Sequence, residues 1–200
     1  MGPLYAREFK VRYTEMDAYG HVNNAAYLRY MHEAAFDASI ASGVALTHWA
    51  DLGRAWYIRD SEIEYLKPLT YPERFTVETW LSARGQAWVQ RDYRFVRDGE
   101  TIAQGFSIWA YVDLKTGGPA VADAAALAPL GGLEAIPIGP RIRFPEPPPA
   151  PAGAYTVTRR VDFRDVDAAG HVNNASYISY MGECAWDVTA HFGWPAERLH

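Results

Sequence analysis

The stretch DAYGHVNNAAYLRYMHEAAFD, at residues 17–37, carries the strongest pattern in this sequence. The pattern returns as DAAGHVNNASYISYMGECAWD at residues 167–187. The two stretches are identical at 14 of 21 positions, at a constant offset of 150 residues and without a gap. Similarity at a fixed period is typical of an internal repeat. We therefore expect a tandem duplication with a unit of about 150 residues.

The repeat and one proline-rich stretch predict the domain boundaries. Five prolines fall within residues 145–151, a composition that favours an extended linker and opposes a sheet strand. We expect a first domain at 1–139, a linker at 140–154, and the beginning of a second unit at 155–200. Since the 200-residue sequence stops at His200, we expect this second unit to hold only a strand and a helix, and the sequence to be a fragment of a longer protein.

Hydrophobic periodicity predicts a strand and a buried helix around the first copy of the pattern. Residues 5–13 alternate as a strand does, and a polar loop follows. Residues 25–41 are apolar over most of a helical circumference, which indicates a helix that is buried rather than lying on a surface. Asn23 or Asn24 can cap the start of this helix, and Gly43 suits a left-handed cap at its end.

After a short helical turn around residues 46–52, the period changes to two. This pattern predicts four strands, at residues 56–66, 75–81, 87–96 and 102–112. The Asp98-Gly99 pair indicates a tight hairpin between the last two. A strand, a buried helix and a strand meander together predict an α+β domain in which an antiparallel sheet wraps around a central helix.

Composition excludes several classes of protein. The chain is 49% hydrophobic and 22% charged, as ordinary folded proteins are. Its net charge of -5 provides no basic field for a nucleic acid or an anionic membrane. The single cysteine, Cys184, cannot form an internal disulfide, and no stretch approaches the roughly 20 apolar residues of a membrane span. With no signal peptide expected, we predict a soluble cytoplasmic protein.

The order of these motifs resembles the hot-dog-fold thioesterases. The motif D-x-x-G-H-V-N-N-x-x-Y lies between a strand and a buried helix, and IEYLKPLTYPE follows at residues 63–73. The resemblance is to the group of 4-hydroxybenzoyl-CoA thioesterase and to acyl-ACP thioesterases. It covers residues 5–115 and returns at 157–193. It implies a hot-dog fold followed by an incomplete second hot-dog unit, with homo-oligomers formed through the sheet.

The same resemblance implies hydrolysis of an acyl-CoA or acyl-ACP thioester without a cofactor, and it places the catalytic carboxylate on Asp17. A carboxylate can activate a water molecule or attack the thioester carbonyl directly, and both roles stay open. Amides at the helix start can stabilise the oxyanion. His21 either takes part in catalysis or holds the loop by a structural bond. Asn24 either holds the water or caps the helix.

Further residues of the motif are candidates for binding substrate. Gly20 and Asn23 belong to the loop and the helix start, and Tyr27 belongs to the first helical turn. Asn23 has capping as its alternative role, and Tyr27 has a place in the core. The equivalent residues of the second unit are Asp167, His171 and Asn174. No metal site is expected, because the histidines lack ligand spacing with one another or with the cysteine.

Three positions depart from relatives of the resembled family. Tyr19 stands where plant-type acyl-ACP thioesterases carry asparagine, and Pro68 stands near the position of their downstream glutamate. Asn24 stands where some bacterial acyl-CoA thioesterases have histidine. These differences favour a simpler site centred on Asp17.

Two other functions are compatible with the fold that the sequence resembles. A hot-dog module that senses acyl-CoA without cleaving it is the main alternative, although Asp17 counts against it. The hydratase branch of the fold spaces its aspartate and histidine five apart, whereas Asp17 and His21 are four apart.

Glu64 is expected on a solvated face. Four arginines are expected on a charged hairpin face rather than at coenzyme A phosphates: Arg84, Arg91, Arg94 and Arg97.

Overall fold

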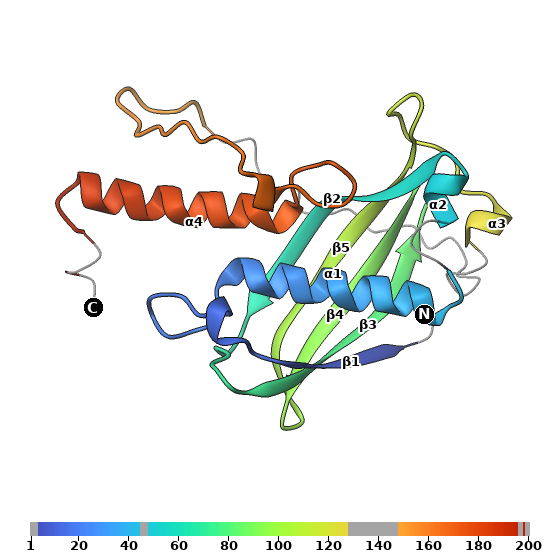
Figure 1. Cartoon of the computed structure of the whole chain (residues 1–200), viewed down its shortest axis with the longest axis horizontal. Coiled ribbons are helices and arrows are strands. Elements are labelled where there is room, and N and C mark those ends of the chain that lie inside the picture. Colours follow the sequence, from blue (N-terminus) through green and yellow to red (C-terminus); the bar gives the residue numbers. More distant parts are fainter. Residues whose placement is uncertain (1–3, 45–47, 128–147, 196–197, 199–200) are drawn as a thin grey trace. The chain divides into compact units, whose positions relative to one another are not determined.

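Alternating apolar residues build one antiparallel sheet in this protein. The computed structural model describes residues 4–44, 48–127, 148–195 and 198. The described residues divide into two compact units, one within 1–22 and 29–139 and the other within 23–28 and 140–200. Each unit is described by itself below, and Figure 1 labels the elements of both.

The first unit holds a five-stranded antiparallel sheet in the order β1-β3-β4-β5-β2. Its strands are β1 (Tyr5–Lys10), β2 (Arg54–Tyr65), β3 (Arg74–Arg84), β4 (Trp88–Arg97) and β5 (Glu100–Asp113). All five strands predicted for the first unit are present. The last four have ends within three residues of those expected, so the predicted α+β class is confirmed.

β1 is shorter than predicted, because it ends at Lys10 rather than at residue 13. Lys10 pairs with Arg74, which is the first residue of β3, so β1 has no further strand residue to pair with beyond Lys10. Val11 still donates its amide to the Glu73 carbonyl at 2.9 Å. The chain then turns into a short 3₁₀ helix, η1 (Tyr13–Glu15).

Helix α1 (Asn24–Ala41) crosses one face of the sheet, as Figure 1 shows. The rings of Tyr30 on α1 and Phe75 on β3 lie 4.9 Å apart, and those of Phe36 on α1 and Trp109 on β5 lie 6.0 Å apart. Met31, which also belongs to α1, is only 1% exposed. Burying such a side chain contributes about 1.5–3 kcal/mol, so this apolar face holds the helix against the sheet.

The turns agree with the sequence. Asp98 and Gly99 have φ angles of 52° and 79° between β4 and β5, as a tight hairpin of the type favoured by Asp-Gly requires. Gly43 ends α1 with a φ of 85°, which confirms the predicted left-handed cap. The predicted turn near residue 46 is α2 (His48–Asp51), and residues 46 and 47 lie outside the described part. A further short helix is α3 (Ala124–Leu127).

The second unit contains η3 (Phe163–Asp165) and α4 (Asn174–His191). The helix was expected, but the strand expected at its beginning is not formed. The described residues 148–195 contain no strand, only an isolated bridge between Val166 and Val172. A strand needs a hydrogen-bonded neighbour, and no other strand lies among these residues. Of the predicted linker, residues 148–154 are described, and they form neither helix nor strand.

Candidate active site

The loop between β1 and α1 folds into a tight turn that brings Asp17, Gly20 and His21 together. Met16 and Val22 form a bridge across its base. Inside it, Asp17 donates its amide to the His21 carbonyl at 2.7 Å, and Gly20 donates its amide to the Asp17 carbonyl at 3.1 Å. Gly20 has a φ of 78°, where a side chain would strain the backbone. This conformation explains the glycine of the motif.

One oxygen of the Asp17 carboxylate is held by the loop itself. Its Oδ1 accepts hydrogen bonds from the amides of Tyr19 at 2.9 Å and His21 at 3.2 Å. Its Oδ2 accepts no hydrogen bond from any described residue, and the residue is half-buried. The turn therefore fixes the orientation of the carboxylate and leaves one oxygen for other chemistry.

Contacts with α1 anchor the loop on one side. The Tyr30 hydroxyl donates a short hydrogen bond to Oε2 of Glu15, which also accepts the Arg12 amide at 2.7 Å. Burial and the bond to the Glu15 carboxylate raise the pKa of Tyr30 well above the usual tyrosine value. The tyrosine therefore stays protonated and remains a donor to Glu15.

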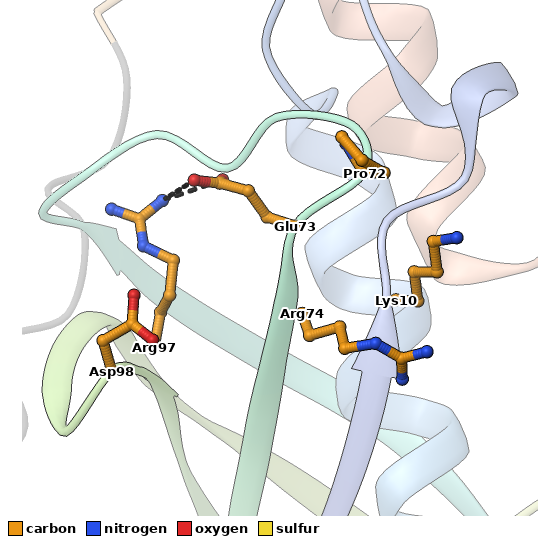
Figure 2. A pocket seen from close by; sticks show the side chains of 6 residues that line it. All are labelled: Lys10, Pro72, Glu73, Arg74, Arg97 and Asp98. Atoms are coloured by element: carbon orange, nitrogen blue, oxygen red, sulfur yellow. Dashed lines mark hydrogen bonds and ion pairs between the residues drawn. The ribbon is translucent and has the colours of Figure 1, made fainter.

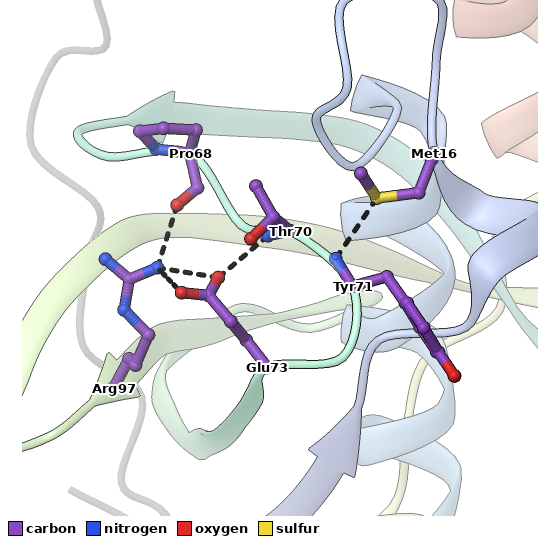
Figure 3. Close-up of polar contacts among 6 residues, drawn as sticks. All are labelled: Met16, Pro68, Thr70, Tyr71, Glu73 and Arg97. Carbon is purple, nitrogen blue, oxygen red and sulfur yellow. Dashed lines mark hydrogen bonds and ion pairs between the residues drawn. The ribbon is translucent and has the colours of Figure 1, made fainter.

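The segment between β2 and β3 anchors the loop on the other side. Val22 donates its amide to the Leu69 carbonyl at 2.8 Å, and the Tyr71 amide lies 3.3 Å from the sulfur of Met16. Leu69 itself is fully buried. The second sequence motif, residues 63–73, therefore supports the loop that carries the first. Figure 3 shows the Met16 contact beside the polar cluster of this segment.

An ion pair fixes the shape of that segment. Arg97 at the end of β4 donates to both carboxylate oxygens of Glu73, at 2.9 and 2.8 Å, and to the Pro68 carbonyl at 3.0 Å. Glu73 also accepts the Thr70 amide at 2.7 Å, as Figure 3 shows. This role of Glu73 and Arg97 was not predicted from the sequence, because their separation of 24 residues leaves no local signal.

A shallow surface pocket of about 440 Å³ lies beside this ion pair and is drawn in Figure 2. Its lining residues are Lys10, Pro72, Glu73, Arg74, Arg97 and Asp98. None of the predicted site residues lines it. Arg74 pairs with Glu8 at 2.7 Å, and Arg97 pairs with Glu73, so most of its positive charge is already neutralised. We assign no substrate to this pocket.

The other predicted site residues have clear positions. Asn23 caps α1, because its Oδ1 accepts the Ala25 amide at 2.9 Å. Asn24 is the first residue of the helix and is exposed. Tyr27 is 2% exposed, which agrees with a place in the core. His21 is exposed, and its ring makes no hydrogen bond to a described residue.

The local structure of the loop recurs in the second unit. Asp167 donates its amide to the His171 carbonyl at 2.9 Å, and its Oδ1 accepts the Ala169 amide at 2.9 Å. Asn173 caps α4 through the Ala175 amide at 3.0 Å, and Asn174 begins the helix. The repeated sequence therefore makes the same turn twice.

The predicted charged face of arginines is correct in part. Arg94 pairs with Glu78 and Arg97 with Glu73, while Glu64 is exposed and bonded to Gln104. Arg91 contradicts the prediction, because it is only 7% exposed. Arg91 is two residues from Val89 and four from Phe95, so its side chain lies on the same buried face of β4 as these apolar residues. The alternation of β4 is therefore a sequence signal for the burial of Arg91.

The described residues offer neither a metal site nor a membrane-spanning helix. They contain no group of three or more His, Cys, Asp or Glu side chains arranged to hold a metal ion. No helix in the described part of the chain is long and apolar enough to cross a membrane.

Comparison with known proteins gives the family. The profile of the Thioesterase-like superfamily matches residues 11–154, which is most of the chain. The chain belongs to the Thioesterase-like superfamily. Its membership agrees with the hot-dog resemblance of the sequence and with the five-stranded sheet described above.

Individual relatives share part of the sequence. An Arabidopsis thaliana protein, the chloroplastic acyl-acyl carrier protein thioesterase ATL3, is 28% identical over 113 residues, 54% of this chain and 60% of its own length. The long-chain acyl-CoA thioesterase FadM of Escherichia coli is 25% identical over 111 residues, 54% of this chain and 83% of its own. This member of the superfamily thus spans less than two thirds of the plant relative.

A solved structure shares the fold over a longer stretch. A Lactobacillus plantarum protein assigned as an oleoyl thioesterase superposes with a TM-score of 0.79, covering 92% of this chain and 72% of its own, at 23% identity. At this identity the likeness concerns the fold alone. It supports the hot-dog architecture of the superfamily member described here.

Proposed function

We propose that this protein hydrolyses an acyl thioester of coenzyme A or of acyl carrier protein to the free acid and the thiol. The observation that carries the proposal is the Asp17 carboxylate. Two backbone amides hold one of its oxygens, and the other has no bond to a described residue. The resemblance of the sequence to the hot-dog-fold thioesterases implies the same residue as the catalytic carboxylate.

Thioester hydrolysis requires a nucleophile and hydrogen-bond donors for the oxyanion. The thioester carbonyl needs either an activated water or a carboxylate nucleophile, and Asp17 can supply either. The oxyanion that develops needs donors, and we propose the amides at the start of α1 for that role. In both routes the carbonyl carbon finally gains the oxygen of a water molecule and its bond to sulfur breaks. The leaving thiolate takes up a proton from that water, so the products are the free acid and the thiol. His21 is proposed to orient the substrate carbonyl or the water.

The first test is thiol release from a panel of acyl-CoA and acyl-ACP substrates by the wild type and Asp17→Asn. Asparagine keeps an oxygen for the amides of Tyr19 and His21, so the turn should survive while the charge is lost. We expect release to fall at least about 100-fold, the range of acid–base catalysis. Asp51→Asn, an exposed aspartate of α2, is the matched control and should keep wild-type activity.

Two outcomes would overturn the proposal. If no substrate releases thiol but acyl-CoA binds by calorimetry, the protein is a sensing module rather than a hydrolase. If Asp17→Asn keeps full activity, another group carries the reaction. In an active wild type, intact-mass spectrometry within the first turnover separates the two roles of Asp17. An added acyl mass means a nucleophile, and no added mass means a general base.

A further inference from the structure

Arg91 is a cation in the interior of the first unit. It lies on β4, 7% exposed, and points to the same face of the sheet as Tyr93 and Phe95, which are 1% and 0% exposed. α1 covers this face, since Phe95 stacks on Phe75 and Phe75 contacts Tyr30 of the helix. Arg91 therefore lies in the layer between the helix and the sheet.

The guanidinium has few partners for such a position. Its one hydrogen bond to a described residue runs from Nη1 to the Thr79 hydroxyl at 3.4 Å, a long contact. No carboxylate of the described residues lies within ion-pair distance of it. A guanidinium carries five N–H donors and keeps its charge in proteins, so most of its bonding capacity is unused.

Other arginines of the same sheet are paired. Arg94 and Arg97, on the same strand, each contact a glutamate, and Arg74 on β3 contacts Glu8. Burying a charge without a partner is costly, and an apolar residue of similar size would be at least as stable there. Burial also lowers the pKa of Arg91, in keeping with this cost. Arg91 is therefore poorly explained by stability.

Two buried hydroxyl side chains lie near Arg91 on the neighbouring strands, Thr79 of β3 and Ser107 of β5, while its register partner on β3 is the apolar Leu81. Ser107 of β5 is its register partner and is fully buried. The Ser107 hydroxyl bonds to the Tyr93 hydroxyl at 2.8 Å and accepts the indole N–H of Trp109 at 2.8 Å. These bonds are complete within the cluster, so none of these side chains neutralises the arginine. Among the described residues, the positive charge of Arg91 thus has hydroxyl neighbours but no countercharge.

We propose that Arg91 binds a carboxylate at the far end of the substrate's acyl group, so that the substrates are ω-carboxyacyl thioesters. This inference rests on the proposed thioesterase function. The carboxylate would supply the missing countercharge, and a guanidinium can bind it through two parallel hydrogen bonds.

The distance along β4 fits an acyl group of some length. Arg97 bonds to the Pro68 carbonyl, and the next residue, Leu69, accepts the amide of Val22 from the Asp17 loop. Arg91 lies six residues earlier on the same strand, about 20 Å away at the usual rise of a strand. The far end of a medium or long acyl chain, rather than its thioester, would meet the arginine.

The experiment compares matched pairs of substrates that differ only at the far end, from dodecanoyl-CoA and dodecanedioyl-CoA up to hexadecanoyl-CoA and hexadecanedioyl-CoA. We expect the wild type to prefer the carboxylate-ended member of a pair in kcat/KM. In Arg91→Met this preference should fall by about 10- to 100-fold, the usual effect of losing hydrogen bonds to a charged group. Arg94→Met, which removes a paired arginine from the other face, should keep the wild-type preference.

The outcomes separate this inference from the proposed function. Binding of each pair to the Asp17→Asn variant is measured by calorimetry, so the preference is read without hydrolysis. Tighter binding of the carboxylate-ended member with an inactive wild type would support Arg91 recognition and reject the thioesterase. Equal binding of both members would overturn the inference even if the wild type is active. An unchanged preference in Arg91→Met, with a lowered melting temperature, would make the arginine structural and also overturn it.

Discussion

At the scale of single residues, the hydroxyl of Tyr30 has a defined task, because it joins the Asp17 loop to α1 through Glu15. Tyr30→Phe removes this donor and leaves the ring in place. We expect the free energy of unfolding to fall by about 1.5–3 kcal/mol, as for a hydrogen bond to a charged group. Thiol release should fall with it, since the loop loses one anchor. Urea denaturation and steady-state kinetics measure the two effects.

The matched control for this change is Tyr13→Phe, in the same loop. Tyr13 is 76% exposed, and its hydroxyl makes no hydrogen bond to a described residue. Its removal should leave both stability and activity within error of the wild type. Equal effects from the two variants would show that the Glu15 contact does not hold the loop.

Residues close in sequence were predictable, and residues joined only by the fold were not. Asp17, Gly20 and His21 lie within five positions, so a local motif could indicate them, and Asn23 follows the ordinary capping preference. The pairing of Glu73 with Arg97 depends on the register of two strands, which a single sequence does not specify. Arg91 was assigned to a charged face by its residue type, although its alternation pointed inward.

At the scale of elements, the β4–β5 hairpin depends on the positive φ of Gly99. Gly99→Ala places a side chain in the left-handed region, which costs roughly 1–2 kcal/mol. We expect urea denaturation to show a loss of this size, with the dependence on urea unchanged. Gly118→Ala is the control, since Gly118 has no such φ and its added methyl group would meet only the Thr116 side chain, at 3.5 Å. A stable Gly99→Ala variant would mean that the turn tolerates another conformation.

Element types followed from the sequence, whereas the ends of elements depended on partners. The strands of the meander alternate clearly, and their hairpin residues mark the turns. β1 ended early because β3 begins at Arg74. The strand expected near Tyr155 did not form, because no described strand lies beside it in the second unit. Periodicity indicates a tendency to extend, but a strand exists only with a neighbour.

At the scale of the whole molecule, the sheet of the first unit has two edges, β1 and β2. β2 is the longer, and its middle residues are exposed. A long edge strand presents unpaired backbone groups, which are a template for pairing with another chain. We therefore predict a homodimer formed through the hot-dog sheet at β2, as the family resemblance also implies. Its mass in solution should be twice 22.4 kDa.

Ser61→Lys tests this interface at the exposed centre of β2. A lysine on an edge strand opposes pairing between sheets, so we expect the variant to be monomeric at concentrations where the wild type is dimeric. The matched control is Glu8→Lys, which places the same charge on the other edge strand, β1, and should remain dimeric. Thr76→Lys is not a suitable control, because β3 is an interior strand and the change there would report only on folding. Analytical ultracentrifugation over a range of concentrations gives the masses. A wild type that stays at 22.4 kDa throughout would rule the dimer out, and dissociation of the Glu8→Lys variant would move the interface to β1.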